Sequence, residues 1–231
     1  MDNLQNILFV APVLLFSVIA HEYAHGYAAL KQGDPTAQDL GRLTWNPVKH
    51  IDPFLTIIMP LMMGLMSNWR VMLGGAKPVP VNPRNYRNYK RGDIIVSLAG
   101  VFTNLLIALG CTAVIALLGF AGRQLPSITN TIAILQVMMI YGVLINIGLI
   151  AFNLIPIPPL DGSHVMKYLL PPAWALKYQE MARYGLLILI ALLAFGRGVL
   201  DIWMKPAYAT IAMLLASVEP LLLPKAAEWF R

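Results

Sequence analysis

The sequence contains few charged residues and almost no cysteine. Only 12% of its 231 residues are charged, about half the fraction of an average soluble domain, whereas 58% are hydrophobic. The single cysteine, Cys111, lies inside an apolar stretch and excludes a disulfide bond within the chain. Because long apolar stretches accompany this low charge, the sequence predicts a polytopic membrane protein in a lipid bilayer.

The formal net charge of +6 does not indicate binding to nucleic acid. The basic residues fall between the apolar stretches and form no patterned face, which is typical of cytoplasmic loops in a membrane protein. No basic region precedes the first apolar stretch, where Asp2 is the sole charge, so we expect a retained span and not a cleaved signal peptide. The sequence indicates no oligomeric state.

The apolar stretches predict an all-α polytopic protein with five full transmembrane helices. A sixth stretch, residues 54–66, is too short to cross and contains Pro60 and Gly64, so we expect a re-entrant or interfacial segment. The prolines between Lys77 and Pro83 favour extended backbone, which predicts short strands near the cytoplasmic face. The predicted spans cover residues 5–30, 94–118, 131–155, 186–199 and 207–223, with a turn through Asp201 and Lys205 between the last two.

The first span contains a motif typical of a metal site. His21 and His25 lie four residues apart, so on a helix both imidazoles share one face, and Glu22 lies about 100° round from His21. Ionisable side chains within a membrane helix are costly and usually mark function. The pattern predicts a bound metal ion with Glu22 as a base beside it.

A catalytic zinc ion usually has three protein ligands and one open position, so the two histidines need a third partner. Asp161 is the best candidate, because a proline-rich break after the 131–155 span can turn its carboxylate inward. Asn153 could project into the same cavity. Asp161 could also be a simple turn residue, and Asn153 could form an interhelical hydrogen bond. The other candidates are His50, His164, Asp52, Asp93 and Asp201.

Membrane topology tests this choice independently. If residues 54–66 do not cross, Asp161 emerges on the side toward which His21 and His25 are displaced. That arrangement places 14 of the 17 Lys and Arg residues on the cytoplasmic side and 3 outside it, in agreement with the positive-inside rule. We therefore predict an N-terminus outside the cell and a metal site toward the cytoplasmic side of the cell membrane.

Four motifs together resemble the site-2 proteases, the membrane-embedded zinc metalloproteases, in a compact prokaryotic form without a peptide-binding domain. The resemblance covers most of residues 15–165, with Val101 at a position where the family commonly has proline. It implies one catalytic Zn²⁺ held by His21, His25 and Asp161, Glu22 as the catalytic base, and Asn153 as a substrate-binding residue. The motifs are His21-Glu22-Tyr23-Ala24-His25-Gly26, Gly33-Asp34-Pro35-Thr36-Ala37, Lys77-Pro78-Val79-Pro80-Val81-Asn82-Pro83, and Asn153 through Gly162.

The resemblance implies hydrolysis of peptide bonds in or near transmembrane segments of membrane-anchored substrates. We expect a single membrane-embedded protease domain over residues 1–231, with a catalytic core at about 5–165 and accessory helices at about 180–223. The Lys77–Pro83 stretch or residues 36–46 could hold an unwound substrate by strand addition. The alternatives are a metal transporter or sensor without hydrolytic activity, and an inactive scaffold. A transporter would not need Glu22 as a base.

Overall fold

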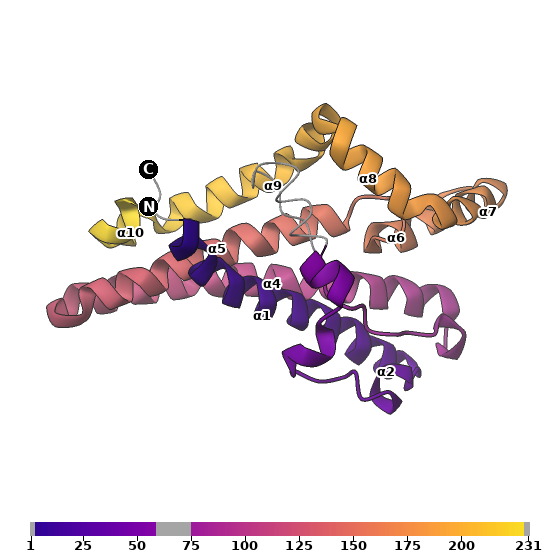
Figure 1. The fold of residues 1–231 in the computed structure, drawn as a ribbon, viewed down its shortest axis with the longest axis horizontal. Coiled ribbons are helices and arrows are strands. Elements are labelled where there is room, and N and C mark those ends of the chain that lie inside the picture. The colour runs from indigo at the N-terminus through magenta and orange to yellow at the C-terminus, as the bar shows by residue number, and fades with distance from the viewer. Residues whose placement is uncertain (1–2, 59–74, 229–231) are drawn as a thin grey trace. The chain divides into compact units, whose positions relative to one another are not determined.

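The computed structural model describes residues 3–58 and 75–228, and within these ranges the regular structure is entirely helical. No strand occurs in the described ranges, so the predicted short strands are not confirmed. The principal helices are α1 (Asn3–Gln32), α2 (Thr36–Asp39), α4 (Tyr89–Gln124), α5 (Thr129–Asn153), α6 (Asp161–Leu169), α7 (Pro172–Met181), α8 (Gly185–Phe195), α9 (Arg197–Val218) and α10 (Pro224–Glu228) (Figure 1). Short 3₁₀ or π turns cover Pro47–His50, Pro53–Ile58, Pro83–Asn85, Pro126–Ile128, Ala182–Tyr184 and Glu219–Leu221.

Within the described residues, five helical segments are long and apolar enough to cross a membrane, the same number as the full spans predicted from the sequence. Large apolar side chains on them face outward; Phe102 is 60% exposed and Leu117 is 66% exposed. Such exposure suits a helix surrounded by lipid, because the lipid tails are as apolar as these side chains. The segments cover residues 8–32, 89–124, 126–153, 172–195 and 197–221.

The predicted turn between the last two spans is wrong. Asp201 and Lys205 lie inside α9, and the break falls instead at Gly196, where α8 ends. Both charged side chains are exposed, and their spacing of four residues places them on one helix face, where opposite charges are compatible with helix. The charges were therefore a misleading sign of a loop.

The predicted re-entrant segment lies largely outside the described residues. Residues 53–58 form a single turn of π-helix, and the remainder of 54–66 is not described. Residues 75–82 have irregular backbone. Three of residues 75–83 are proline, which has no N–H to donate to a strand ladder, and this limits strand pairing here.

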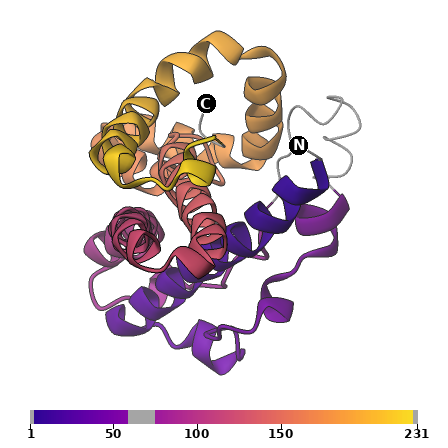
Figure 2. The same ribbon diagram turned by 90° about the vertical axis from the view of Figure 1, so that its left-hand side faces the viewer.

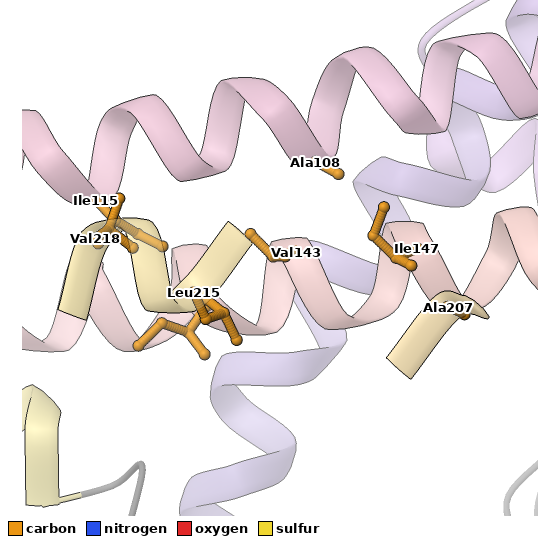
Figure 3. Packing of buried hydrophobic residues seen from close by; sticks show 8 residues of the cluster. Ala108, Ile115, Val143, Ile147, Ala207, Leu215 and Val218 are labelled. Atoms are coloured by element: carbon orange, nitrogen blue, oxygen red, sulfur yellow. The ribbon is translucent and has the colours of Figure 1, made fainter. Parts of the chain in front are cut away.

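The contacts divide the chain into two units: residues 18–100, and residues 1–17 with 101–231. In the second unit α5 and α9 run side by side (Figure 1), and α4 lies beside α5, as Figure 2 shows with α4 nearly end-on. Their shared apolar cluster includes Ile115, Val143 and Leu215 (Figure 3). A Cβ built at Gly142 would lie 2.5 Å from Cys111 Sγ, so the glycine permits this close helix approach.

Candidate metal centre

His21 and His25 are brought together by one turn of α1 in the 18–100 unit. Their side chains are 6% and 9% exposed, and their Nε2 atoms lie 2.9 Å apart. Four-residue spacing produces this proximity, because successive turns of a helix stack such side chains on one face. The sequence prediction of two imidazoles on a common face is therefore confirmed.

A backbone carbonyl sets the orientation of the His25 ring. Nδ1 of His25 lies 2.7 Å from the carbonyl oxygen of Val96 in α4. Because a carbonyl oxygen can only accept, Nδ1 donates, and the lone pair of the neutral ring is on Nε2, which faces His21. Histidines that bind metals characteristically donate their other N–H to such an acceptor.

The spacing of the two Nε2 atoms also fits a metal ion. Two nitrogens bound to tetrahedral zinc lie about 3.3 Å apart, from Zn–N bonds of about 2.05 Å. The observed 2.9 Å requires a small outward rotation of the rings. The donor set, burial and ring orientation therefore suit zinc.

Gly100 of α4 provides the space for the His21 ring. A Cβ at this position would lie 2.5 Å from Cε1 of His21 and 2.6 Å from both ring nitrogens. No side chain larger than hydrogen fits there without moving the imidazole. Gly100 therefore determines where His21 presents its Nε2.

We expect Gly100→Ala to weaken zinc binding about 10- to 100-fold, the range found when groups that orient metal ligands are lost. The added methyl group displaces the His21 ring from its partner. Gly110→Ala is the matched control, because a Cβ at Gly110, on the same helix, meets nothing within 4 Å. Competition with a chromogenic chelator measures both affinities, and equal affinities would contradict this role of Gly100.

Glu22 lies beside the histidines and is held by a distant segment of the chain. Its Oε2 accepts a hydrogen bond from the backbone N–H of Val79, with 2.8 Å between N and O. The Val79 side chain packs on α1 at Gly26, where a Cβ would lie 2.9 Å from Val79 Cγ1. This contact joins α1, which carries the histidine pair, to the irregular segment 75–82.

Asp34 anchors the other end of that segment. Its carboxylate is fully buried and accepts hydrogen bonds from the Asn82 N–H at 2.6 Å, the Asn85 amide at 2.8 Å, and the Thr36 hydroxyl and N–H. Burial raises the pKa of Asp34, but these donors together outweigh burial and hold the pKa below its ordinary value of 3.8. Gly33, with φ of 109°, makes the turn that leads into this site.

We expect the segment around Asn82 to loosen in acid. A carboxyl group with a lowered folded-state pKa contributes stability that is present above 3.8 and is lost as the pH falls through the folded-state pKa. Hydrogen exchange of residues 79–88, corrected for intrinsic rates, should therefore accelerate below about pH 4. The measurement uses zinc-free protein, so that loss of metal in acid does not contribute to the exchange rates. In Asp34→Asn the acid-dependent step should disappear, and a persisting step would contradict this assignment.

Asp161 and Asn153 lie in the other unit. The chain turns sharply between them: α5 ends at Asn153 and α6 begins at Asp161. A Cβ at Gly162 would overlap the carbonyl group of Leu154, so this glycine allows α6 to start against the end of α5. Nδ2 of Asn153 donates to the carbonyl oxygen of Leu149 at 3.0 Å. The shared site of Asp161 with the two histidines stays a prediction.

Three features of this site were not predicted from the sequence. The bond from Val79 to Glu22 spans 57 positions, the Asp34 site has partners up to 51 positions away, and Gly100 acts through packing. The Pro78-Val79-Pro80 pattern is the one available signal, since Val79 is its only residue with an N–H. His50, one of the other candidates for the third ligand, is 1% exposed, and its Nε2 donates to the Thr44 carbonyl at 2.8 Å.

Comparison with known proteins agrees with this chemistry. Residues 9–195 match the model of peptidase family M50. The chain is 33% identical over 217 residues to the "putative zinc metalloprotease YwhC" of Bacillus subtilis (strain 168), covering 93% of this chain and 94% of that protein. It is 29% identical over 182 residues to the similarly named Rip2 of Mycolicibacterium smegmatis, covering 78% of this chain and 64% of that relative.

No solved structure matches the chain significantly. The family match nevertheless spans most of the sequence, including the histidine motif of α1 and the proline-rich break before α6. The predicted resemblance is thereby confirmed, and the chain belongs to peptidase family M50, the site-2 proteases.

Proposed function

We propose that the chain is an intramembrane zinc metalloprotease that hydrolyses peptide bonds in or near the transmembrane segments of membrane-anchored proteins. The observation that carries the proposal is the buried imidazole pair of α1, with Nε2 atoms 2.9 Å apart and a glutamate beside them, in a helix of membrane-spanning length. Membership of a metallopeptidase family supports the reaction type.

In this proposal His21, His25 and Asp161 hold one zinc ion. Two neutral imidazoles and one carboxylate form a donor set typical of catalytic zinc and leave a fourth position open. A zinc ion held by these residues would lower the pKa of a bound water toward about 7 and polarise the scissile carbonyl. The Val96 carbonyl keeps His25 in the tautomer that the ion requires.

Glu22 performs the proton transfers. One carboxylate oxygen takes the proton of the attacking water, and the same group later delivers it to the nitrogen of the leaving amine. Because Oε2 accepts the Val79 N–H, Oε1 is the oxygen that would take the proton. One N–H of the Asn153 amide donates to the Leu149 carbonyl at 3.0 Å, and the second N–H of the same amide could donate to the substrate.

Substrate binding requires local unwinding, because the carbonyls of a transmembrane helix are engaged in its own hydrogen bonds. The Lys77–Pro83 stretch is a poor edge for strand addition, since the N–H groups of Lys77, Val79 and Asn82 already donate within the protein. Within residues 36–46, α2 occupies residues 36–39, so strand addition is possible only for residues 40–46. One membrane-embedded domain, with a core at about 5–165, would contain the site.

The positive-inside distribution supports a site near the cytoplasmic side and an N-terminus outside. The experiment that tests the proposed function is cleavage of a single-span test substrate by purified protein, comparing wild type with Glu22→Gln and measuring bound zinc in both. Zinc bound without Glu22-dependent cleavage would instead favour a metal transporter or sensor.

A further inference from the structure

The segment 75–82 makes a contact that the proposed reaction does not itself require. Within Pro78-Val79-Pro80 only Val79 has a backbone N–H, because a proline nitrogen carries no hydrogen. That single donor is bonded to Oε2 of Glu22 at 2.8 Å. The only N–H of the tripeptide therefore donates to Glu22, the proposed base.

Other contacts hold the segment in place on both sides of Val79. The Lys77 N–H donates to the His50 carbonyl at 2.8 Å, and the Arg42 guanidinium donates to the carbonyls of Lys77 at 2.9 Å and Pro78 at 3.2 Å. On the far side the Asn82 N–H donates to Asp34 at 2.6 Å. These contacts therefore hold the Val79 N–H in place independently of its bond to Glu22.

The Val79 side chain adds a third restraint. It is 6% exposed and packs against α1 at Gly26, one helical turn after Glu22. A larger residue at Gly26 would push Val79 away, since its Cβ would lie 2.9 Å from Val79 Cγ1. The segment is thus seated on the helix that carries the base.

We propose that the Val79 N–H is a positioning group for Glu22, and that residues 77–82 form a brace whose purpose is to deliver this one donor. This inference rests on the proposed function, in which Glu22 is the base. Glutamate has three side-chain torsions and loses appreciable rotamer freedom when it is ordered. Holding Oε2 fixes the carboxylate before substrate arrives and directs Oε1 toward the attacking water.

The test removes the Val79 N–H, which is the donor to Glu22. Val79 is replaced by its α-hydroxy acid, which converts the Pro78–Val79 amide to an ester and keeps the valine side chain. The matched control is the same replacement at Val81, a residue of the same type two positions along the segment. We expect kcat of the Val79 ester to fall about 10- to 100-fold, the range for losing a hydrogen bond to a charged group. KM and bound zinc should remain at wild-type values, as should all three quantities in the Val81 ester.

A second comparison, made in the Glu22→Asp variant, distinguishes a loss of Glu22 positioning from a general loss of structure. The shorter side chain of Glu22→Asp does not reach the Val79 N–H, so in that background the Val79 ester should change kcat less than about twofold. An unchanged kcat in the wild-type background would overturn the proposal, as would an equal loss in both backgrounds. Loss of zinc in the Val79 ester alone would also overturn it, because the amide would then support the metal site.

An activity-independent measurement distinguishes this proposal from the proposed function. Hydrogen exchange of the Val79 amide should accelerate in Glu22→Ala, because the acceptor is removed. Unchanged exchange would overturn the proposal. Wild-type protein that shows this protection but cleaves no substrate would refute the proposed function while leaving the contact established.

Discussion

Replacing Glu22 with glutamine should lower the rate of substrate cleavage about 10²- to 10⁴-fold while leaving the bound zinc in place. Glutamine has the same shape as glutamate, and its carbonyl oxygen can still accept the Val79 N–H. The amide cannot take a proton from the attacking water. His21 and His25 are untouched, so the metal content should remain at the wild-type value.

The comparison needs a glutamate that lies outside the site. Glu180 in α7 is exposed, and Glu180→Gln changes the net charge by the same amount. Cleavage of a single-span substrate by gel assay, with zinc measured by atomic emission, should separate the two variants. Full activity in Glu22→Gln would exclude Glu22 as the base, and equal losses in both variants would exclude a specific role.

Helix α1 and its histidine pair could be predicted because the sequence pattern that defines them is local. The spacing of His21 and His25 places both rings on one helix face whatever surrounds them, and the apolar residues before them predict a span. The observed helix, Asn3–Gln32, differs from the predicted 5–30 only at its ends. The same reasoning placed the break before Asp161, because a run of prolines cannot continue a helix.

The contacts around Glu22 could not be predicted because they depend on packing between distant segments. Val79 and Glu22 are 57 positions apart, and no local rule brings them together. A single sequence gives no signal for the role of Gly100 either. Glycine is required there only because the His21 ring packs against it in the folded protein. The error at Asp201 and Lys205 has the opposite origin: both residues favoured a loop locally, yet α9 carries them on an exposed face.

Replacing Asp161 with asparagine should lower the zinc affinity of the protein at least about 100-fold, and cleavage should fall with metal occupancy. A carboxylate contributes charge as well as a ligand atom, whereas an amide oxygen of the same shape contributes only a weak neutral donor. Asp161 is the first residue of α6, after the turn that Gly162 makes possible, so the substitution should leave the fold intact. Added zinc should restore part of the cleavage, because two histidines remain.

Asp201→Asn is the matched control, since Asp201 is an exposed acid on α9 and loses the same charge. Zinc affinity from chelator competition, measured on protein purified in detergent, distinguishes the variants independently of activity. Wild-type affinity in Asp161→Asn would place the third ligand elsewhere in the chain. A loss in Asp161→Asn that zinc reverses, with none in Asp201→Asn, would assign the third position to Asp161, since it separates a missing ligand from a misfolded protein.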